Sequence, residues 1–140
     1  STGVIGVPLN IDAIKDGIPM LTDRLSKEGF DNDATAIMTT DTYKKQLAFK
    51  FTIDDKSITI GAMAKGSGMI EPNMGTMLSF ITTDLSISGE MLNEALKESV
   101  KISYNRVSVD GDTSTNDMVL VLANGLAKND EIKEIKYYSS

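Results

Sequence analysis

The chain contains no cysteine and no histidine among its 140 residues. Without cysteine it can form no disulfide, no zinc–thiolate site and no thiol nucleophile. Without histidine, every mechanism that uses imidazole as a base is excluded within this chain. Any proton transfer therefore falls to a carboxylate, a lysine, a tyrosine or an α-amino group.

Positive charge and long apolar runs are also scarce. The chain has 14 lysines and arginines against 20 aspartates and glutamates, so its net charge is -6. This acidic balance argues against nucleic acid as a partner. No apolar run approaches the roughly 18 residues that a membrane-spanning helix needs. We therefore expect neither a nucleic-acid nor a membrane partner.

The length and the composition suit one domain. The 140 residues are 41% hydrophobic and 24% charged, which is ordinary for a globular protein. We expect a single domain over residues 1–140 with its own core. The first residues lack a signal-peptide pattern, and the chain begins with Ser1 instead of methionine. We therefore expect a processed or excised piece of a longer protein.

Hydrophobic periodicity predicts two helices and several strands. The expected helices span about residues 11–28 and 88–104, and the expected strands about residues 46–53, 58–63, 76–83, 107–109 and 118–123. Asn10 or Asp12 caps the first helix and Ser88 the second. A turn at 54–57 joins the first two strands into a hairpin, and residues 34–38 form a strand or a helical turn.

Hairpin strands that alternate with amphipathic helices predict a layered α/β or α+β fold. The polar tail, residues 128–140, is expected to be loosely held.

Two stretches resemble binding loops and depart from them in chemistry. In Gly61–Ser67, the lysine precedes the second glycine, so it is misplaced for a phosphate-binding loop. The loop DGDTSTND at 110–117 has Thr115 where a calcium loop needs its sharp-turn glycine, and Val121 where it needs a bidentate glutamate. A polar turn with self-bonding side chains is the favoured interpretation, and a structural cation is the alternative.

A glycine-rich loop runs directly into an expected strand and places Thr76 after Gly75. A glycine turn followed by a β-branched strand residue explains most such pairs. The alternative follows from the missing histidine: Thr76 becomes chain-terminal by self-cleavage and uses its own α-amino group as base. The reference pKa of that amine, about 7.7–8.0, suits work near neutral pH. Lys65 is a cation in the same loop that can lie near this oxygen nucleophile.

Four stretches together resemble the ornithine acetyltransferase (ArgJ) family, also called bifunctional glutamate N-acetyltransferases. They are STGVIGVPL at 1–9, AIMTTDT at 36–42, AKGSGMIEPNMGTMLSFITTD at 64–84 and VDGDTSTNDMVLVLANG at 109–125. The resemblance covers most of the chain. It implies that the chain is the central part of a longer acetyltransferase, with further substrate-binding residues beyond residue 140.

The resemblance implies a role for particular residues. Thr76 matches the family's nucleophile, and cleavage at Gly75–Thr76 would give chains 1–75 and 76–140. Many family members have alanine before the nucleophile, where this chain has Gly75. Thr2 and Gly3 match the pair that forms the oxyanion hole, in which a hydroxyl and a backbone N–H stabilise negative charge.

Thr39, Lys65 and Thr76 itself match substrate-binding positions in the same family. A lysine there suits an amino-acid carboxylate. The family implies no metal and no nucleotide cofactor, with acetyl-CoA as an additional acetyl donor if the enzyme is bifunctional.

The implied fold is an N-terminal-nucleophile-like sandwich, DmpA/ArgJ-like, with β-sheet between helices. The implied activity is glutamate N-acetyltransferase in arginine biosynthesis: acetyl moves from N-acetylornithine to glutamate through an acetyl-threonine ester. The family further implies a cytoplasmic enzyme whose cleaved halves stay associated, and a homo-oligomer in the full-length parent. The alternatives are an aminopeptidase or amidase on the same scaffold, or an inactive excised fragment.

Overall fold

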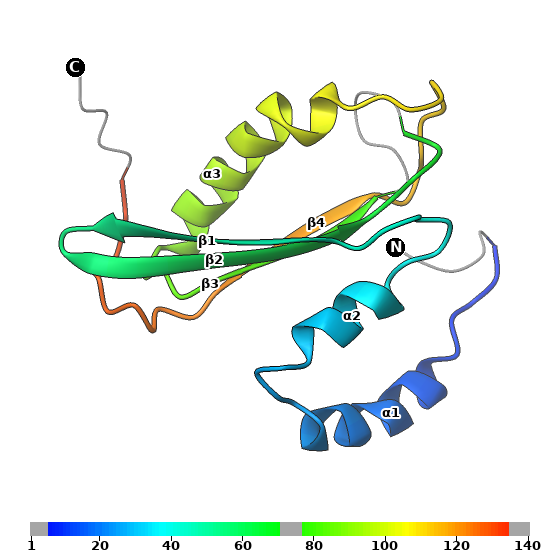
Figure 1. The fold of residues 1–140 in the computed structure, drawn as a ribbon, viewed down its shortest axis with the longest axis horizontal. Coiled ribbons are helices and arrows are strands. Elements are labelled where there is room, and N and C mark those ends of the chain that lie inside the picture. Colours follow the sequence, from blue (N-terminus) through cyan, green and yellow to red (C-terminus); the bar gives the residue numbers. More distant parts are fainter. Residues whose placement is uncertain (1–5, 71–76, 135–140) are drawn as a thin grey trace.

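The computed structural model describes residues 6–70 and 77–134 of the chain. These residues form one mixed α/β domain (Figure 1). The elements are α1 (Ile11–Asp23), α2 (Phe30–Ala36), β1 (Lys45–Ile53), β2 (Lys56–Lys65), β3 (Leu78–Thr83), α3 (Gly89–Ile102), the 3₁₀ turn η1 (Tyr104–Arg106) and β4 (Met118–Ala123).

The four strands form one sheet in the order β1-β2-β3-β4. The first three strands are antiparallel neighbours, whereas β4 pairs parallel to β3. Parallel neighbours require a long crossover connection, and α3 supplies it. The predicted hairpin between β1 and β2 is confirmed. Its turn residues Asp54 and Asp55 have φ values of 45° and 61°, a left-handed conformation that aspartate tolerates in tight hairpins.

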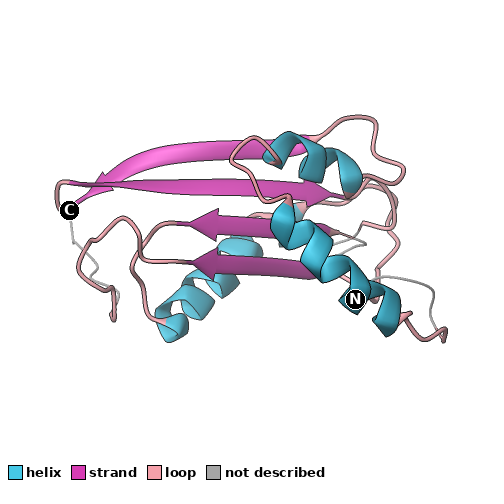
Figure 2. Ribbon diagram, turned by 90° about the horizontal axis from the view of Figure 1, so that it is seen from below, coloured by secondary structure: helices cyan, strands magenta, loops and turns pink. Residues whose placement is uncertain are grey.

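The helices lie on both faces of the sheet. Figure 2 shows α1 and α2 on one face, with α3 behind the strands on the other. Ser88 caps α3 as predicted, because its hydroxyl accepts from the Met91 N–H at 3.3 Å. The layered α+β expectation therefore holds at the level of a mixed α/β domain. The full sandwich of the N-terminal-nucleophile type stays a prediction.

Helix α1 begins where the sequence predicts and ends early. Asn10 caps it through a bond from the Ala13 N–H, but the helix stops at Asp23 instead of about residue 28. None of its residues is buried. Without packing on its apolar face, only local propensity holds the helix, and Thr22 and Asp23 are poor helix formers.

Two other expectations were wrong. Residues 107–109 form no strand, although the Val109 N–H donates to the Ile70 carbonyl at 2.8 Å. In the tail, residues 128–134 are held in place, because the Asn129 amide bonds both backbone groups of Ser86. Residues 135–140 lie outside the described part of the chain. Residues 34–38 begin in α2, so the helical alternative is the right one there.

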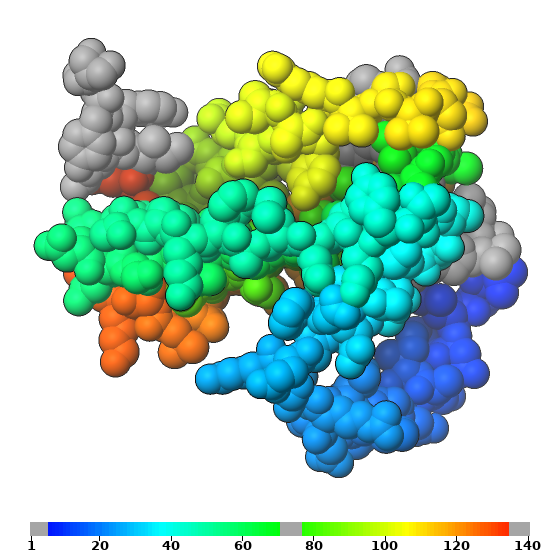
Figure 3. Space-filling view, viewed as in Figure 1, coloured from blue at the N-terminus to red at the C-terminus, as the bar shows by residue number. Residues whose placement is uncertain are grey.

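The core of the described domain is small. Among residues 6–70 and 77–134, the buried apolar side chains are Ala34, Ile58, Leu78 and Met91. Many large apolar side chains are exposed instead, and α1 projects from the body of the molecule (Figure 3). Within the same residues, no helix is both long and apolar enough to cross a membrane.

This surface predicts how the isolated chain behaves. Leu47 and Phe49 on β1 are each 60% exposed, so the chain on its own is expected to bind an apolar dye strongly. Threonine at both positions keeps β-propensity and removes apolar area, and should lower the dye fluorescence. Dye binding as weak as that of a well-packed domain would contradict the burial pattern.

Candidate active site

The turn at residues 39–41 lies against the end of β2. The Lys65 ammonium lies 3.4 Å from the Thr39 hydroxyl and donates to it. One residue after Thr39 and two residues after Lys65, the hydroxyls of Thr40 and Ser67 are hydrogen-bonded at 2.6 Å. The structure therefore brings together Thr39 and Lys65, which are 26 positions apart in the sequence.

Asp41 completes this junction from the inside. Its Oδ1 accepts from the Gly66 N–H at 2.8 Å and from the Lys45 ammonium at 2.6 Å, and its Oδ2 accepts from the Thr39 N–H at 3.2 Å. The Asp41 side chain is only 1% exposed. Sequence reasoning missed this role, because an aspartate that follows two threonines is most simply a turn residue.

The carboxylate of Asp41 is held in its charged form. Burial by itself would raise its pKa, but the bonds from Lys45, Gly66 and Thr39 outweigh burial and lower the pKa to about 2. A carboxyl whose pKa falls on folding stabilises the native state above its unfolded pKa of about 3.9. That contribution is lost as the pH falls through about 2.

A small cavity of about 180 Å³ lies at this end of the sheet. Lys65, Gly66, Met77 and Tyr104 are among the residues that line it. In the β2–β3 ladder, Lys65 is the direct partner of Leu78. The antiparallel pairing of β2 and β3 thus places Lys65 opposite Leu78, which lies two positions after Thr76 in the chain.

The DGDTSTND loop holds the two ends of the segment that carries the predicted scissile bond. Upstream, the Asp110 carboxylate accepts from the N–H groups of Met69 at 2.6 Å and Ile70 at 3.0 Å. Downstream, Asp117 accepts from the Met77 N–H at 2.8 Å. The bonds from Met69 and Ile70 are the main reason that the pKa of Asp110 lies below its ordinary value.

These bonds decide between the two interpretations of that loop. Asp110 and Asp117 point to backbone N–H groups, and Asp110 also accepts from the Asp112 N–H at 3.3 Å. Within residues 6–70 and 77–134, no three acidic side chains are grouped so that they could hold a metal ion. The polar-turn interpretation is therefore favoured. The phosphate-loop resemblance also fails, because Gly61 and Lys65 lie in the extended strand β2.

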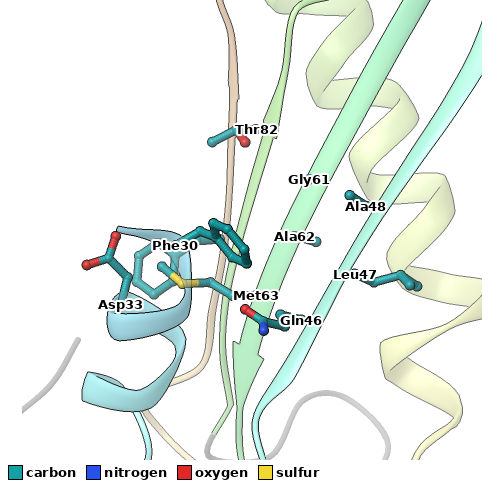
Figure 4. Close-up of a pocket in the computed structure, with 10 residues that line it drawn as sticks. Phe30, Asp33, Gln46, Leu47, Ala48, Gly61, Ala62, Met63 and Thr82 are labelled. Atoms are coloured by element: carbon teal, nitrogen blue, oxygen red, sulfur yellow. The ribbon is translucent and has the colours of Figure 1, made fainter. Parts of the chain in front are cut away.

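A larger hollow of about 520 Å³ lies between α2 and the sheet. Figure 4 shows Phe30 of α2 beside Met63 of β2, with the Asp33 carboxylate pointing away from the strands. Its walls are mostly apolar and include no lysine or arginine. It is a gap between one helix and an incompletely covered sheet face, and its polar lining residues, Asp33, Gln46 and Thr82, are not among the residues expected at the site.

Comparison with known proteins agrees with the motifs. The model of the ArgJ family matches residues 1–138. The chain belongs to the ArgJ family. It is 59% identical over 132 residues to the arginine biosynthesis bifunctional protein ArgJ of Symbiobacterium thermophilum, covering 94% of this chain and 33% of that protein.

Other ArgJ proteins match over the same part. ArgJ 1 of Clostridium acetobutylicum is 59% identical over 92% of this chain and 32% of that protein. ArgJ of Thermotoga neapolitana is 57% identical over 96% of this chain and 34% of that protein. The chain thus spans about a third of the length of the curated relatives it matches.

One solved structure shows a weaker likeness. The PH0078 protein from Pyrococcus horikoshii OT3 has a TM-score of 0.42 and 17% identity, covering 68% of this chain and 32% of that one. A likeness at this level supports no conclusion about the fold.

For an ArgJ-family chain, the described residues include only part of the expected site. Thr39 and Lys65 lie together at the end of β2. Thr2, Gly3, Gly75 and Thr76 lie outside the described residues, so their roles stay predictions. The anchors on either side of residues 71–76, Asp110 and Asp117, were not predicted as functional residues. The sequence feature that could have pointed to them is the group of aspartates in the DGDTSTND loop.

Proposed function

We propose that this ArgJ-family chain is the central part of an enzyme that transfers acetyl from N-acetylornithine to glutamate in arginine biosynthesis, in the cytoplasm. The observation that carries the proposal is the hydrogen bond between Lys65 and Thr39. Lys65 also pairs with Leu78, which lies two positions after Thr76 in the chain. The ammonium of Lys65 is a suitable partner for the carboxylate of an amino-acid substrate. The names of the relatives, which assign them to arginine biosynthesis, support the pathway.

The proposed reaction proceeds through an ester on Thr76. Self-cleavage at Gly75–Thr76 frees the α-amino group of Thr76, which takes the proton from its own hydroxyl. The oxygen attacks the acetyl carbon of N-acetylornithine, the C–N bond breaks, and ornithine leaves with the proton. The amino group of glutamate then attacks the ester carbon. The C–O bond to Thr76 breaks, N-acetylglutamate leaves, and the proton lost by the amine regenerates the Thr76 hydroxyl. Thr2 and Gly3 would stabilise the oxyanion in both steps.

The sheet explains how the two halves could stay associated after cleavage. β2 lies before the predicted scissile bond and β3 after it, and they pair antiparallel from Ile60↔Thr83 to Lys65↔Leu78. Hydrogen bonds of this ladder do not depend on the peptide bond between residues 75 and 76. The proposal needs no metal and no nucleotide, and it includes acetyl-CoA as a second acetyl donor and a homo-oligomeric parent.

Self-cleavage is expected to depend on the anchor at Asp117. Asp117→Ala removes the acceptor for the Met77 N–H, and Met77 directly follows Thr76. A hydrogen bond to a charged group contributes roughly 1.5–3 kcal/mol, so we expect cleavage to slow by about 10- to 100-fold. Asp112→Asn, an exposed aspartate in the same loop, is the control. Equal cleavage rates in the two variants, followed by intact mass over time, would remove Asp117 from this role.

The transfer itself is tested with the full-length protein, N-acetylornithine and glutamate. The proposal expects ornithine and N-acetylglutamate in equal amounts. Release of acetate in place of N-acetylglutamate would favour an amidase, because water would then be the acceptor. No turnover of N-acetylornithine by the full-length, cleaved protein would contradict the proposal. The 140-residue chain in the same assay tests whether this part alone is inactive.

A further inference from the structure

We propose that Asp41 is the positioning residue of the substrate-carboxylate site: it sets Thr39 and Lys65 in place and neutralises Lys45, so that Lys65 alone presents its charge to an N-acyl amino acid. This inference rests on the proposed function, since it concerns the same site. It adds Asp41, whose carboxylate accepts hydrogen bonds from Thr39, Lys45 and Gly66.

The backbone bonds of Asp41 join the two halves of the site. One carboxylate oxygen holds the Gly66 N–H at 2.8 Å, next to Lys65, and the other holds the Thr39 N–H at 3.2 Å. The carboxylate therefore fixes the spacing between the two peptides that carry the paired side chains. Because the Asp41 side chain is 1% exposed, it acts through these neighbours and not by touching a ligand.

The two lysines at this junction differ in their surroundings. The Lys45 ammonium lies 2.6 Å from the Asp41 carboxylate and 4.7 Å from the centre of the Tyr43 ring. Both contacts satisfy a cation. For Lys65, no carboxylate of residues 6–70 or 77–134 lies within ion-pair distance, and its bonding partner is the neutral Thr39 hydroxyl. Lys65 is thus the cation left to pair with an added anion.

Loss of the Asp41 charge would disturb both features. In Asp41→Asn the amide offers one acceptor oxygen, and its NH₂ group opposes at least one of the donors that now meet the carboxylate. Lys45 would also lose its counter-ion and become a second cation beside Lys65. The expected result is a site that attracts a carboxylate more strongly, because two cations now face it, but that no longer holds it at the Lys65–Thr39 pair alone.

Binding to the full-length protein, co-expressed as two chains that meet at the bond between residues 75 and 76 and carry Thr76→Ala, tests this without turnover and without the need for self-cleavage. Calorimetry would compare N-acetylornithine with its carboxamide, which lacks the negative charge. With Asp41 present, the carboxylate should bind about tenfold or more tightly than the carboxamide. Asp41→Asn should raise this preference by about threefold or more, because Lys45 becomes a second cation beside Lys65, while binding of the carboxamide changes little. The matched control is Asp31→Asn, which removes another lysine-paired carboxylate, half-exposed and bonded to Lys44.

A second variant keeps the test valid if Asp41→Asn does not fold. Lys45→Met leaves the backbone bonds of Asp41 intact and frees its charge to oppose an anion beside Lys65. We expect it to weaken carboxylate binding by about fivefold or more and to leave the carboxamide unchanged.

Three results would overturn the inference. The first is an unchanged carboxylate preference in both the Asp41 and the Lys45 variants. The second is an equal loss for the two ligands, because a merely structural aspartate would affect both alike. The third is a carboxamide that binds the parent as tightly as N-acetylornithine does. Failure of the proposed function appears elsewhere, as a wild-type parent that transfers no acetyl group.

Discussion

Thr76→Ala in the full-length protein is expected to abolish cleavage between Gly75 and Thr76 and, with it, all acetyl transfer. The substitution removes the oxygen that attacks the Gly75 carbonyl and later carries the acetyl group. Thr76→Ser should retain part of both activities, because a hydroxyl remains. An intact-mass measurement would show one uncut chain for the alanine variant and two chains for the wild type.

A matched control separates chemistry from folding. Thr82→Ala removes a hydroxyl from β3, the strand that follows Thr76 in the chain, at an exposed position. It should cleave like the wild type. Two chains from the Thr76→Ala variant, with a new terminus at residue 76, would show that some other group cuts the bond and would contradict the proposed nucleophile.

Lys65→Met is expected to have the second largest effect, on substrate binding. It keeps most of the apolar stem and deletes the ammonium that lies 3.4 Å from the Thr39 hydroxyl. A charge-assisted bond of roughly 1.5–3 kcal/mol corresponds to a KM for N-acetylornithine that rises by about 10- to 100-fold.

The same variant should shift the pH optimum upward. A cation near the Thr76 α-amine disfavours its protonated form and lowers its pKa, so removal of that cation raises the pKa again. The free amine would then become abundant only at higher pH. Lys50→Met on the exposed part of β1 is the control, and neither quantity should change there. If KM and the pH optimum also stay the same for Lys65→Met, Lys65 is a surface lysine.

Hydrophobic periodicity and turn residues predicted most of the helices and strands, because the formation of each element depends largely on residues that are near one another in the sequence. The strand expected at 118–123 matches β4, and the β1–β2 hairpin follows from alternation around a short polar turn. The end of α1 was wrong because periodicity continues to Leu25, although no packing supports the last turn. Periodicity reports which face is apolar, and tertiary packing decides whether the helix persists.

The site was predictable only in part. Thr39 and Lys65 were expected from the family motifs. The absence of histidine and cysteine excluded imidazole bases and thiol nucleophiles but indicated no particular residue. The missed residues act over long range: Asp41 bonds Gly66, 25 positions away, and Asp110 bonds Met69, 41 positions away. A carboxylate that accepts a distant backbone N–H leaves no local pattern. Such partners become visible only when the sheet has placed the loops side by side.

The most direct test of the central claim is the intact mass of the full-length protein after incubation with N-acetylornithine in the absence of glutamate. The proposed mechanism predicts two chains, of which the one that begins at Thr76 is heavier by one acetyl group, and this added mass should disappear when glutamate is supplied. A single uncut chain, or an acetyl group carried by a residue other than Thr76, would contradict it.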